Sequence, residues 1–140
     1  MSQIAKLSDF APLLEGWAPY GDGFAGFVGP LYTRQLGGLT AWGFLAEARH
    51  LNPAGNVHGG MLATFIDDAV SLAACSETGG IGQATIQLNI HFIGAVKEKE
   101  FVEAQCYVMR RARTVIFMRA ECRVGQRVVA TADGIWKLFG

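Results

Sequence analysis

Residues 59–76 read Gly-Gly-Met-Leu-Ala-Thr-Phe-Ile-Asp-Asp-Ala-Val-Ser-Leu-Ala-Ala-Cys-Ser, and this segment is the only long helix that the sequence predicts. Apolar side chains cover most of its circumference, which is typical of a buried helix. They are Met61, Leu62, Ala63, Phe65, Ile66, Ala69, Val70, Leu72, Ala73 and Ala74. The polar exceptions are spaced three or four residues apart and form one narrow stripe: Thr64, Asp67, Asp68 and Ser71.

Four segments that follow this helix alternate between apolar and polar residues, and this period of two predicts strands. We expect strands at residues 85–93, 101–109, 115–124 and 127–138. In the first, Thr85 is expected on the polar face with Gln87, Asn89 and His91, and in the last Val128 is expected to point inward with Ala130, Ala132, Trp136 and Leu138. Short connections between these segments favour an antiparallel meander.

Before the helix, residues 27–35 and 39–49 are plausible strands, and residues Ser8 to Leu14 fit a short helix. The predicted architecture is therefore α+β, with one antiparallel sheet wrapped around one long helix. With 140 residues and no linker or repeat, the chain is expected to form a single domain over residues 1–140.

The composition narrows the classes of function. Twelve Lys and Arg balance twelve Asp and Glu, which argues against a nucleic-acid binder. Only 17% of residues are charged and 51% are hydrophobic, so we expect surface to be hidden in an oligomer. Neither a signal peptide nor a membrane span is expected, and three cysteines without CxxC spacing favour reduced thiols in the cytoplasm.

The residues that suggest chemistry lie between Asn52 and Asp68. Gly59 and Gly60 fall where the first helical amides are unpaired, and such amides favour an oxyanion. His58 precedes them, and a carboxylate follows two helical turns later in apolar surroundings that would increase its basicity. This combination suits transfer of an acyl group to water.

Simpler interpretations remain open at this point. The Gly-Gly pair could be a turn that opens a helix, and Asp67 and Asp68 could be exposed charges. His50 and His91 fit ordinary histidines at the surface or in a strand. No pair of histidines has the spacing of metal ligands, and the Gly-x-Ser-x-Gly pattern of common serine hydrolases is absent.

Asn52, His58-Gly59-Gly60 and Asp67, nine residues after the histidine, resemble the signature of hotdog-fold acyl-CoA thioesterases. The resemblance is greatest to the PaaI-like, phenylacetate-degradation group and covers residues 39–138. It implies hydrolysis of an acyl-CoA, in which coenzyme A is part of the substrate and no cofactor is needed. It also implies a homodimer or homotetramer in which sheets join edge to edge and each site is shared between subunits.

The resemblance implies a role for each matched residue. Asp67 would activate water as general base or attack as nucleophile, the Gly59 amide would bind the thioester oxygen, and Asn52 and His58 would position the reactants. The wider set expected to contact the substrate is Gly60, Thr64, Asp68, Phe92 and Gly94, with Phe65, Phe92 and Ile93 as walls of an apolar tunnel.

Three features leave alternatives open. Some relatives hold the water with a Ser or Thr after the helix, and the corresponding position is expected at Gly94, where no hydroxyl exists. Asp68 could be structural or could share the site with Asp67. Arg110, Arg111 and Arg113 fit either a solvated turn or a contact to the CoA phosphates.

Two further functions stay open. One is an acyl-CoA binding module without turnover, which the missing hydroxyl at Gly94 makes conceivable, and the other is an acyl-thioester hydratase or dehydratase.

Overall fold

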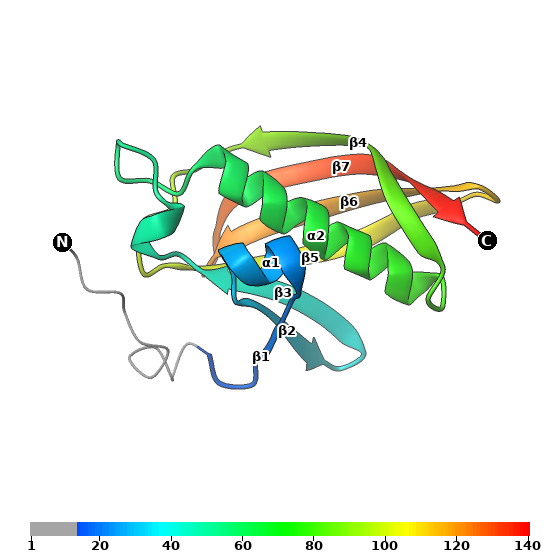
Figure 1. Cartoon of the computed structure of the whole chain (residues 1–140), viewed down its shortest axis with the longest axis horizontal. Helices are drawn as coiled ribbons and strands as arrows, with labels where there is room; N and C mark the ends of the chain where they lie inside the picture. Colours follow the sequence, from blue (N-terminus) through cyan, green and yellow to red (C-terminus); the bar gives the residue numbers. More distant parts are fainter. Residues whose placement is uncertain (1–13) are drawn as a thin grey trace.

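The computed structural model describes residues 14–140, and within them a seven-stranded antiparallel sheet curves around one long helix (Figure 1). The elements are β1 (Ala18–Tyr20), α1 (Gly23–Val28), β2 (Leu31–Leu36), β3 (Leu39–Leu45), a 3-10 turn (Ala48–His50), α2 (Gly59–Glu77), β4 (Gly82–Phe92), β5 (Phe101–Arg111), β6 (Val115–Val124) and β7 (Arg127–Phe139). The strand order is β1-β2-β3-β5-β6-β7-β4, which leaves β1 and β4 at the two edges.

The predicted central helix is confirmed, because α2 begins at Gly59 and ends at Glu77. Its inner face carries fully buried Phe65 and Ile66, which belong to one core with Phe44 of β3 and Trp136 of β7. Opposite that face, Thr64 and Asp67 are only partly buried. The hotdog architecture implied by the resemblance is therefore present, with Thr64 and Asp67 of the polar stripe on the side of the helix opposite the buried face.

Three expectations about the elements are wrong. Residues 27 and 28 end α1 and do not begin a strand, and the strand expected over residues 39–49 stops at Leu45, before the 3-10 turn. The meander comprises only β5, β6 and β7, because β4 pairs with β7 and β3 pairs with β5. The short helix expected over residues 8–14 lies outside the described residues, except for Leu14, which is in a turn.

A register irregularity at Ile86 changes which side chains of β4 face the helix. Thr85 lies opposite the buried Trp136, whereas the next paired residue, Gln87, lies opposite Ile135 on the outer face. One extra residue in a strand reverses the alternation on one side of the bulge. Thr85 therefore faces α2, and the expectation that it shares the polar face of Gln87 and Asn89 is wrong.

A second irregularity affects β7. Cys122 pairs with Ala130 and Arg123 with Val128, so Val129 is the inserted residue. Val129 is fully buried and Val128 only partly so. The prediction that Val128 points inward is therefore wrong by one position.

No helix of residues 14–140 is long and apolar enough to cross a membrane.

Candidate active site

The first turn of α2 is capped by His58. Its backbone is extended, with φ −60° and ψ 136°, and its Nδ1 accepts a hydrogen bond from the Gly60 N–H at 2.8 Å. Both glycines were expected among the unpaired helical amides, but the Gly60 amide is therefore occupied. The Gly59 N–H has no partner among residues 14–140, which leaves it as the amide that can bind an oxyanion.

Asn52 shapes the loop that leads into α2. Its Oδ1 accepts from the backbone N–H groups of Ala54 and Asn56, at 3.0 and 3.1 Å. The loop is fixed from the other side by Lys97, whose Nζ donates to Asn56 Oδ1. The carbonyl end of Asn52 is thus used within the loop.

Asp67 is held by Thr85, which is not among the residues predicted for the site. The hydroxyl of Thr85 donates to Asp67 Oδ1 at 2.6 Å, across from β4 to α2. Gly94, which was expected to stand where some relatives carry a hydroxyl, lies beyond the end of β4, and its N–H donates to the Val129 carbonyl. The hydroxyl beside Asp67 in this structure belongs to Thr85. The period-two pattern alone could not find Thr85, because the bulge at Ile86 hides its orientation.

Asp67 and Thr85 line a cavity of about 590 Å³ on the outer side of α2. One side is formed by α1 and the residue before it, through Asp22, Phe24 and Ala25, and the other by Thr85 and Leu88 of β4. Its floor is the polar stripe of α2 with Ala63: Thr64, Asp67, Asp68 and Ser71. The predicted polar stripe is thus the floor of the largest of the described cavities.

Asp68 lines the same cavity but faces β1. It interacts with the hydroxyl of Tyr20, yet the geometry falls short of a regular hydrogen bond, so Tyr20 Oη and Asp68 Oδ2 are both buried without a regular partner among the described residues. Burial raises the pKa of the Asp68 carboxyl, the Tyr20 hydroxyl acts against this increase, and the charge of Asp67 adds to it. Burial also raises the pKa of Tyr20 far above its ordinary value, so the phenol stays neutral.

The two halves of the expected site are far apart within one chain. Asp67 follows Gly59 by eight residues, which is about 12 Å along a helix that rises about 1.5 Å per residue. None of His58, Gly59 and Gly60 lines the cavity that contains Asp67. A single thioester group cannot contact both the Gly59 amide and the Asp67 carboxylate of the same chain.

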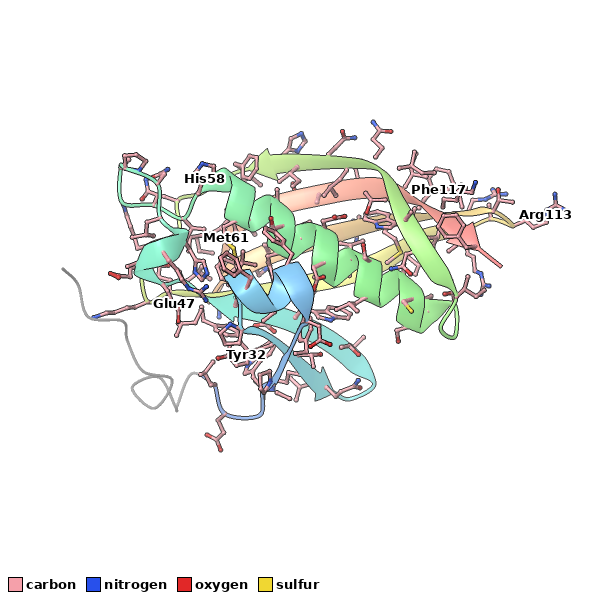
Figure 2. All side chains as sticks on the ribbon, in the orientation of Figure 1. Tyr32, Glu47, His58, Met61, Arg113 and Phe117 are labelled. Atoms are coloured by element: carbon pink, nitrogen blue, oxygen red, sulfur yellow. The ribbon has the colours of Figure 1, made fainter. Side chains whose placement is uncertain are left out.

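The remaining predicted residues fall into separate regions. Phe65 is fully buried in the core and cannot be a wall of the substrate site, whereas Phe92 and Ile93 are exposed at the end of β4. The Phe92 ring lies beside Gly59, at 3.5 Å from where a Cβ would be. Arg110, Arg111 and Arg113 are exposed at the β5–β6 hairpin, and Figure 2 shows Arg113 at the opposite end of the sheet from His58. Within residues 14–140 these arginines form no salt bridge.

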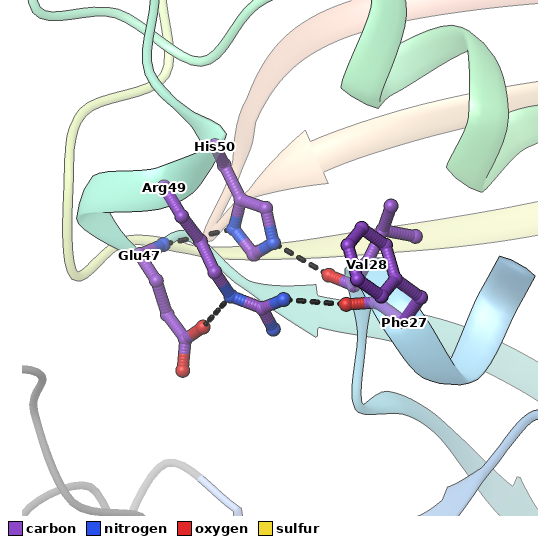
Figure 3. A network of polar contacts seen from close by, with 5 residues as sticks. All are labelled: Phe27, Val28, Glu47, Arg49 and His50. Atoms are coloured by element: carbon purple, nitrogen blue, oxygen red, sulfur yellow. Dashed lines mark hydrogen bonds and ion pairs between the residues drawn. The ribbon is translucent and has the colours of Figure 1, made fainter.

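His50 is a structural residue, buried to 6% exposure. Its Nδ1 accepts from the Glu47 N–H, so its Nε2 carries the proton and donates to the Val28 carbonyl at 2.6 Å (Figure 3). Arg49 donates to the Phe27 carbonyl at 2.6 Å and pairs with Glu47. These bonds attach the C-terminal end of α1 to the 3-10 turn.

Among the described residues, no three His, Cys, Asp or Glu side chains cluster as metal ligands would.

The sheet curved around one long helix, with a partly buried carboxylate on the outer side of that helix and a free amide at its start, agrees with the hotdog family that the sequence resembles. The family model of the thioesterase superfamily matches residues 54–131. The chain therefore belongs to the thioesterase superfamily, and the names of its relatives group it with thioester hydrolases.

Human acyl-coenzyme A thioesterase 13 is 31% identical over 72 residues, which cover 51% of this chain and 51% of that protein. The match thus spans about half the length of this curated relative. The PaaI protein from the phenylacetic acid degradation operon of Escherichia coli superposes with a TM-score of 0.77 at 19% identity, covering 96% of this chain and 93% of that chain. A Bacillus halodurans protein solved with CoA gives a TM-score of 0.79 at 19% identity, over 96% and 89% of the two chains. At these identities the likeness shows the fold.

The raised pKa of Asp68 has a consequence for stability. The folded protein holds the Asp68 proton to a higher pH than the unfolded chain, where aspartate ionises near pH 4, so ionisation of Asp68 costs stability as pH rises through this window. Asp68→Asn removes this cost. We expect the variant to melt at a higher temperature than wild type at pH 7, with the gain shrinking as the pH falls toward about 4, where Asp68 becomes protonated in both the folded and the unfolded chain.

The measurement is thermal unfolding followed by circular dichroism across this pH range. Asp22→Asn is the matched control, because Asp22 lines the same cavity but is exposed and makes no capping hydrogen bond. A gain for Asp68→Asn that is the same at every pH, or a loss at pH 7, would contradict the assignment.

Proposed function

We propose that the protein is an acyl-CoA thioesterase that hydrolyses aryl-CoA or medium- to long-chain acyl-CoA to the free acid and CoA. The observation that carries this proposal is the hydrogen bond from Thr85 to Asp67 in the cavity over α2. A carboxylate fixed at one oxygen keeps the other free to accept a proton, which is what a general base requires.

In the proposed reaction, a water oxygen attacks the thioester carbon while Asp67 takes the water proton. The Gly59 amide stabilises the oxyanion that forms, as backbone donors do in acyl transfer. The C–S bond then breaks, and the proton held by Asp67 passes to the CoA sulfur. Attack by the Asp67 carboxylate itself would be an alternative first step with the same products. Thr85 would orient Asp67 and, through its free lone pair, can accept a hydrogen bond from the water.

The distance between Gly59 and Asp67 supports a site shared by two subunits. β4 is an edge strand, and Ile86 and Phe92 are exposed along it. Along this strand, Thr85 lies beside Asp67 of α2, and Phe92 lies beside Gly59 of α2. Because Ile86 is an inserted residue, the middle of the paired positions from Thr85 to Phe92 lies at Asn89. Antiparallel pairing of two β4 edges about a two-fold axis at this point would bring Asp67 of one protomer to Gly59 of the other.

The same pairing brings opposite ends of the two sheets together. The β5–β6 hairpin of one protomer would then lie toward the start of α2 in its partner, because these features are at opposite ends of one chain (Figure 2). Arg110, Arg111 and Arg113 are therefore proposed to contact the phosphates of a CoA bound at the partner's Gly59. Further pairing of dimers into a tetramer is compatible with this arrangement.

The alternatives have less support. A hydratase or dehydratase of this fold would pair a histidine with a carboxylate, but His58 Nδ1 accepts from the Gly60 amide. A binding module without turnover was suggested by the absent hydroxyl at Gly94, but Thr85 supplies a hydroxyl to Asp67. Both observations favour hydrolysis.

Asp67→Asn should lower kcat by about 100-fold or more, because the amide cannot accept the water proton. The assay follows thiol release from a panel of aryl- and fatty-acyl-CoAs. Asp68→Asn should have a milder effect, since Asp68 makes no regular hydrogen bond to Thr85 or Asp67. If both variants hydrolyse every substrate at the wild-type rate, the mechanism is wrong.

Thr85→Val keeps the shape of the side chain but removes the hydrogen bond to Asp67. We expect kcat to fall about 10- to 100-fold, because a misdirected base loses the alignment that the reaction needs. Thr85→Ser retains the hydroxyl and should keep activity close to wild type. Equal rates for the Val and Ser variants would show that the hydroxyl has no role.

Mixing two inactive variants tests whether the site is shared. Gly59→Pro removes the free amide, and proline is well tolerated at the first position of a helix after an extended residue such as His58. In a heterodimer of Asp67→Asn and Gly59→Pro chains, one site combines intact Asp67 with intact Gly59. Random reassortment should therefore restore about a quarter of wild-type activity.

Mixing Asp67→Asn with Thr85→Val provides the control, because both residues come from the same side of a shared site. That mixture should restore nothing beyond the activity of the Thr85→Val chains. Absence of restoration in the first mixture, with heterodimers demonstrated by mass, would mean that each site is built from one chain.

A further inference from the structure

The helix α1 carries two phenylalanines on its surface, and only one of them lines the cavity over α2. Phe24 is 64% exposed and Phe27 is 78% exposed. Phe24 lines the cavity that contains Asp67 and Thr85, whereas Phe27 does not. Figure 1 shows α1 beside the middle of α2, and residues of both helices line the cavity that contains Asp67. Exposed aromatic surface at a cavity favours an apolar occupant.

The backbone that carries Phe24 is fixed at both ends. At the C-terminal end, Arg49 and His50 donate to the carbonyls of Phe27 and Val28 (Figure 3). At the N-terminal end, Tyr20 of β1 pairs with Leu31 of β2. In between, Gly26 packs so closely on the Gly21 carbonyl that a Cβ would approach it to 2.9 Å. A helix of six residues is thereby held in one position, and with it the Phe24 ring.

The lining of the cavity is divided between reactive and apolar groups. Asp67 and Thr85 must lie at the thioester carbon if Asp67 activates the water. The rest of the acyl group must then extend along the remaining lining, where the apolar side chains are Phe24, Ala25, Ala63 and Leu88. Phe24 is the only aromatic residue in the described lining and the largest apolar one. An acyl group long enough to reach it removes apolar surface of both partners from water.

We propose that Phe24 is a specificity-determining residue that forms the apolar wall for the acyl group and selects aryl or long-chain acyl groups over short ones. This inference rests on the proposed thioesterase function, because that function assigns the acyl group to the cavity of Asp67. Phe24 contacts only the body of the acyl group, so its contribution grows with acyl size. For an acetyl group, which ends one carbon from the thioester, the contribution is small.

The test compares Phe24→Ala with Phe27→Ala, a control on the same helix with a still more exposed ring outside the cavity. Thiol release is measured with phenylacetyl-CoA and acetyl-CoA. Phe24→Ala should lower the ratio of kcat/KM for phenylacetyl-CoA over acetyl-CoA by about tenfold or more, chiefly through KM. Phe24→Leu should recover part of the ratio, and Phe27→Ala should leave it unchanged.

An unchanged ratio in Phe24→Ala, or an equal change in Phe27→Ala, would overturn the inference. Failure of the proposed function has a different signature, because wild type would then release no thiol from any acyl-CoA. In that event calorimetric binding of phenylacetyl-CoA and acetyl-CoA to the same variants gives the ratio of affinities. A melting temperature equal to that of wild type confirms that the alanine variant is folded, and Phe24→Leu replaces it otherwise.

Discussion

The packing of one face of α2 into the curve of the sheet is the constraint on which the other features depend. Phe65 and Ile66 are fully buried there, and Trp136 of β7 both fills the core and donates to Ser71 of α2 at 2.9 Å. Apolar burial determines how the helix is rotated about its axis. The free energy is lowest when the side with the most apolar surface is removed from water against the sheet. Once this rotation is set, Asp67 and Thr64 must face the opposite side. The position of the reactive carboxylate is thus a consequence of core packing.

That same geometry separates the two groups proposed to act on the thioester. The Gly59 amide and the Asp67 carboxylate lie on one helix, and a rigid helix cannot bring them together. In the proposed dimer, two copies of the helix that run in opposite directions would place the two groups at one site. The low content of charged residues agrees with this, since part of the sheet edge would be covered by a second subunit. The three exposed arginines of the β5–β6 hairpin would then be the main cationic groups near a bound CoA.

Much of this fold could be read from the sequence, for reasons that are local. The helix over residues 59–76 is predicted within one residue at its C-terminal end, because apolar residues surround it and Gly-Gly marks its start. The alternation in residues 115–124 is confirmed, because both irregularities in the pairing of β6 insert a residue in a neighbouring strand, Met109 in β5 and Val129 in β7, and none in β6 itself. Strand order was not predictable, because a connection of the length of residues 93–100 can join two neighbouring strands or cross the end of the sheet. In this structure it crosses the sheet, since β4 pairs with β7 and β5 pairs with β3 and β6. The helix α1 was missed because six residues with two glycines show no helical period.

The site was predictable where it depends on spacing and not where it depends on register. His58, Gly59 and Asp67 follow from their positions on one helix, and the structure adds the cap that distinguishes Gly59 from Gly60. Thr85 was assigned to the wrong face because an insertion of one residue leaves no mark in a pattern of alternating polarity. That insertion at Ile86 has a second consequence. An uninterrupted edge strand offers its backbone to any extended chain and promotes aggregation, whereas a bulge interrupts the regular ladder of donors and acceptors and so protects the edge. The insertion that turns the Thr85 hydroxyl toward Asp67 therefore also interrupts the edge of the sheet.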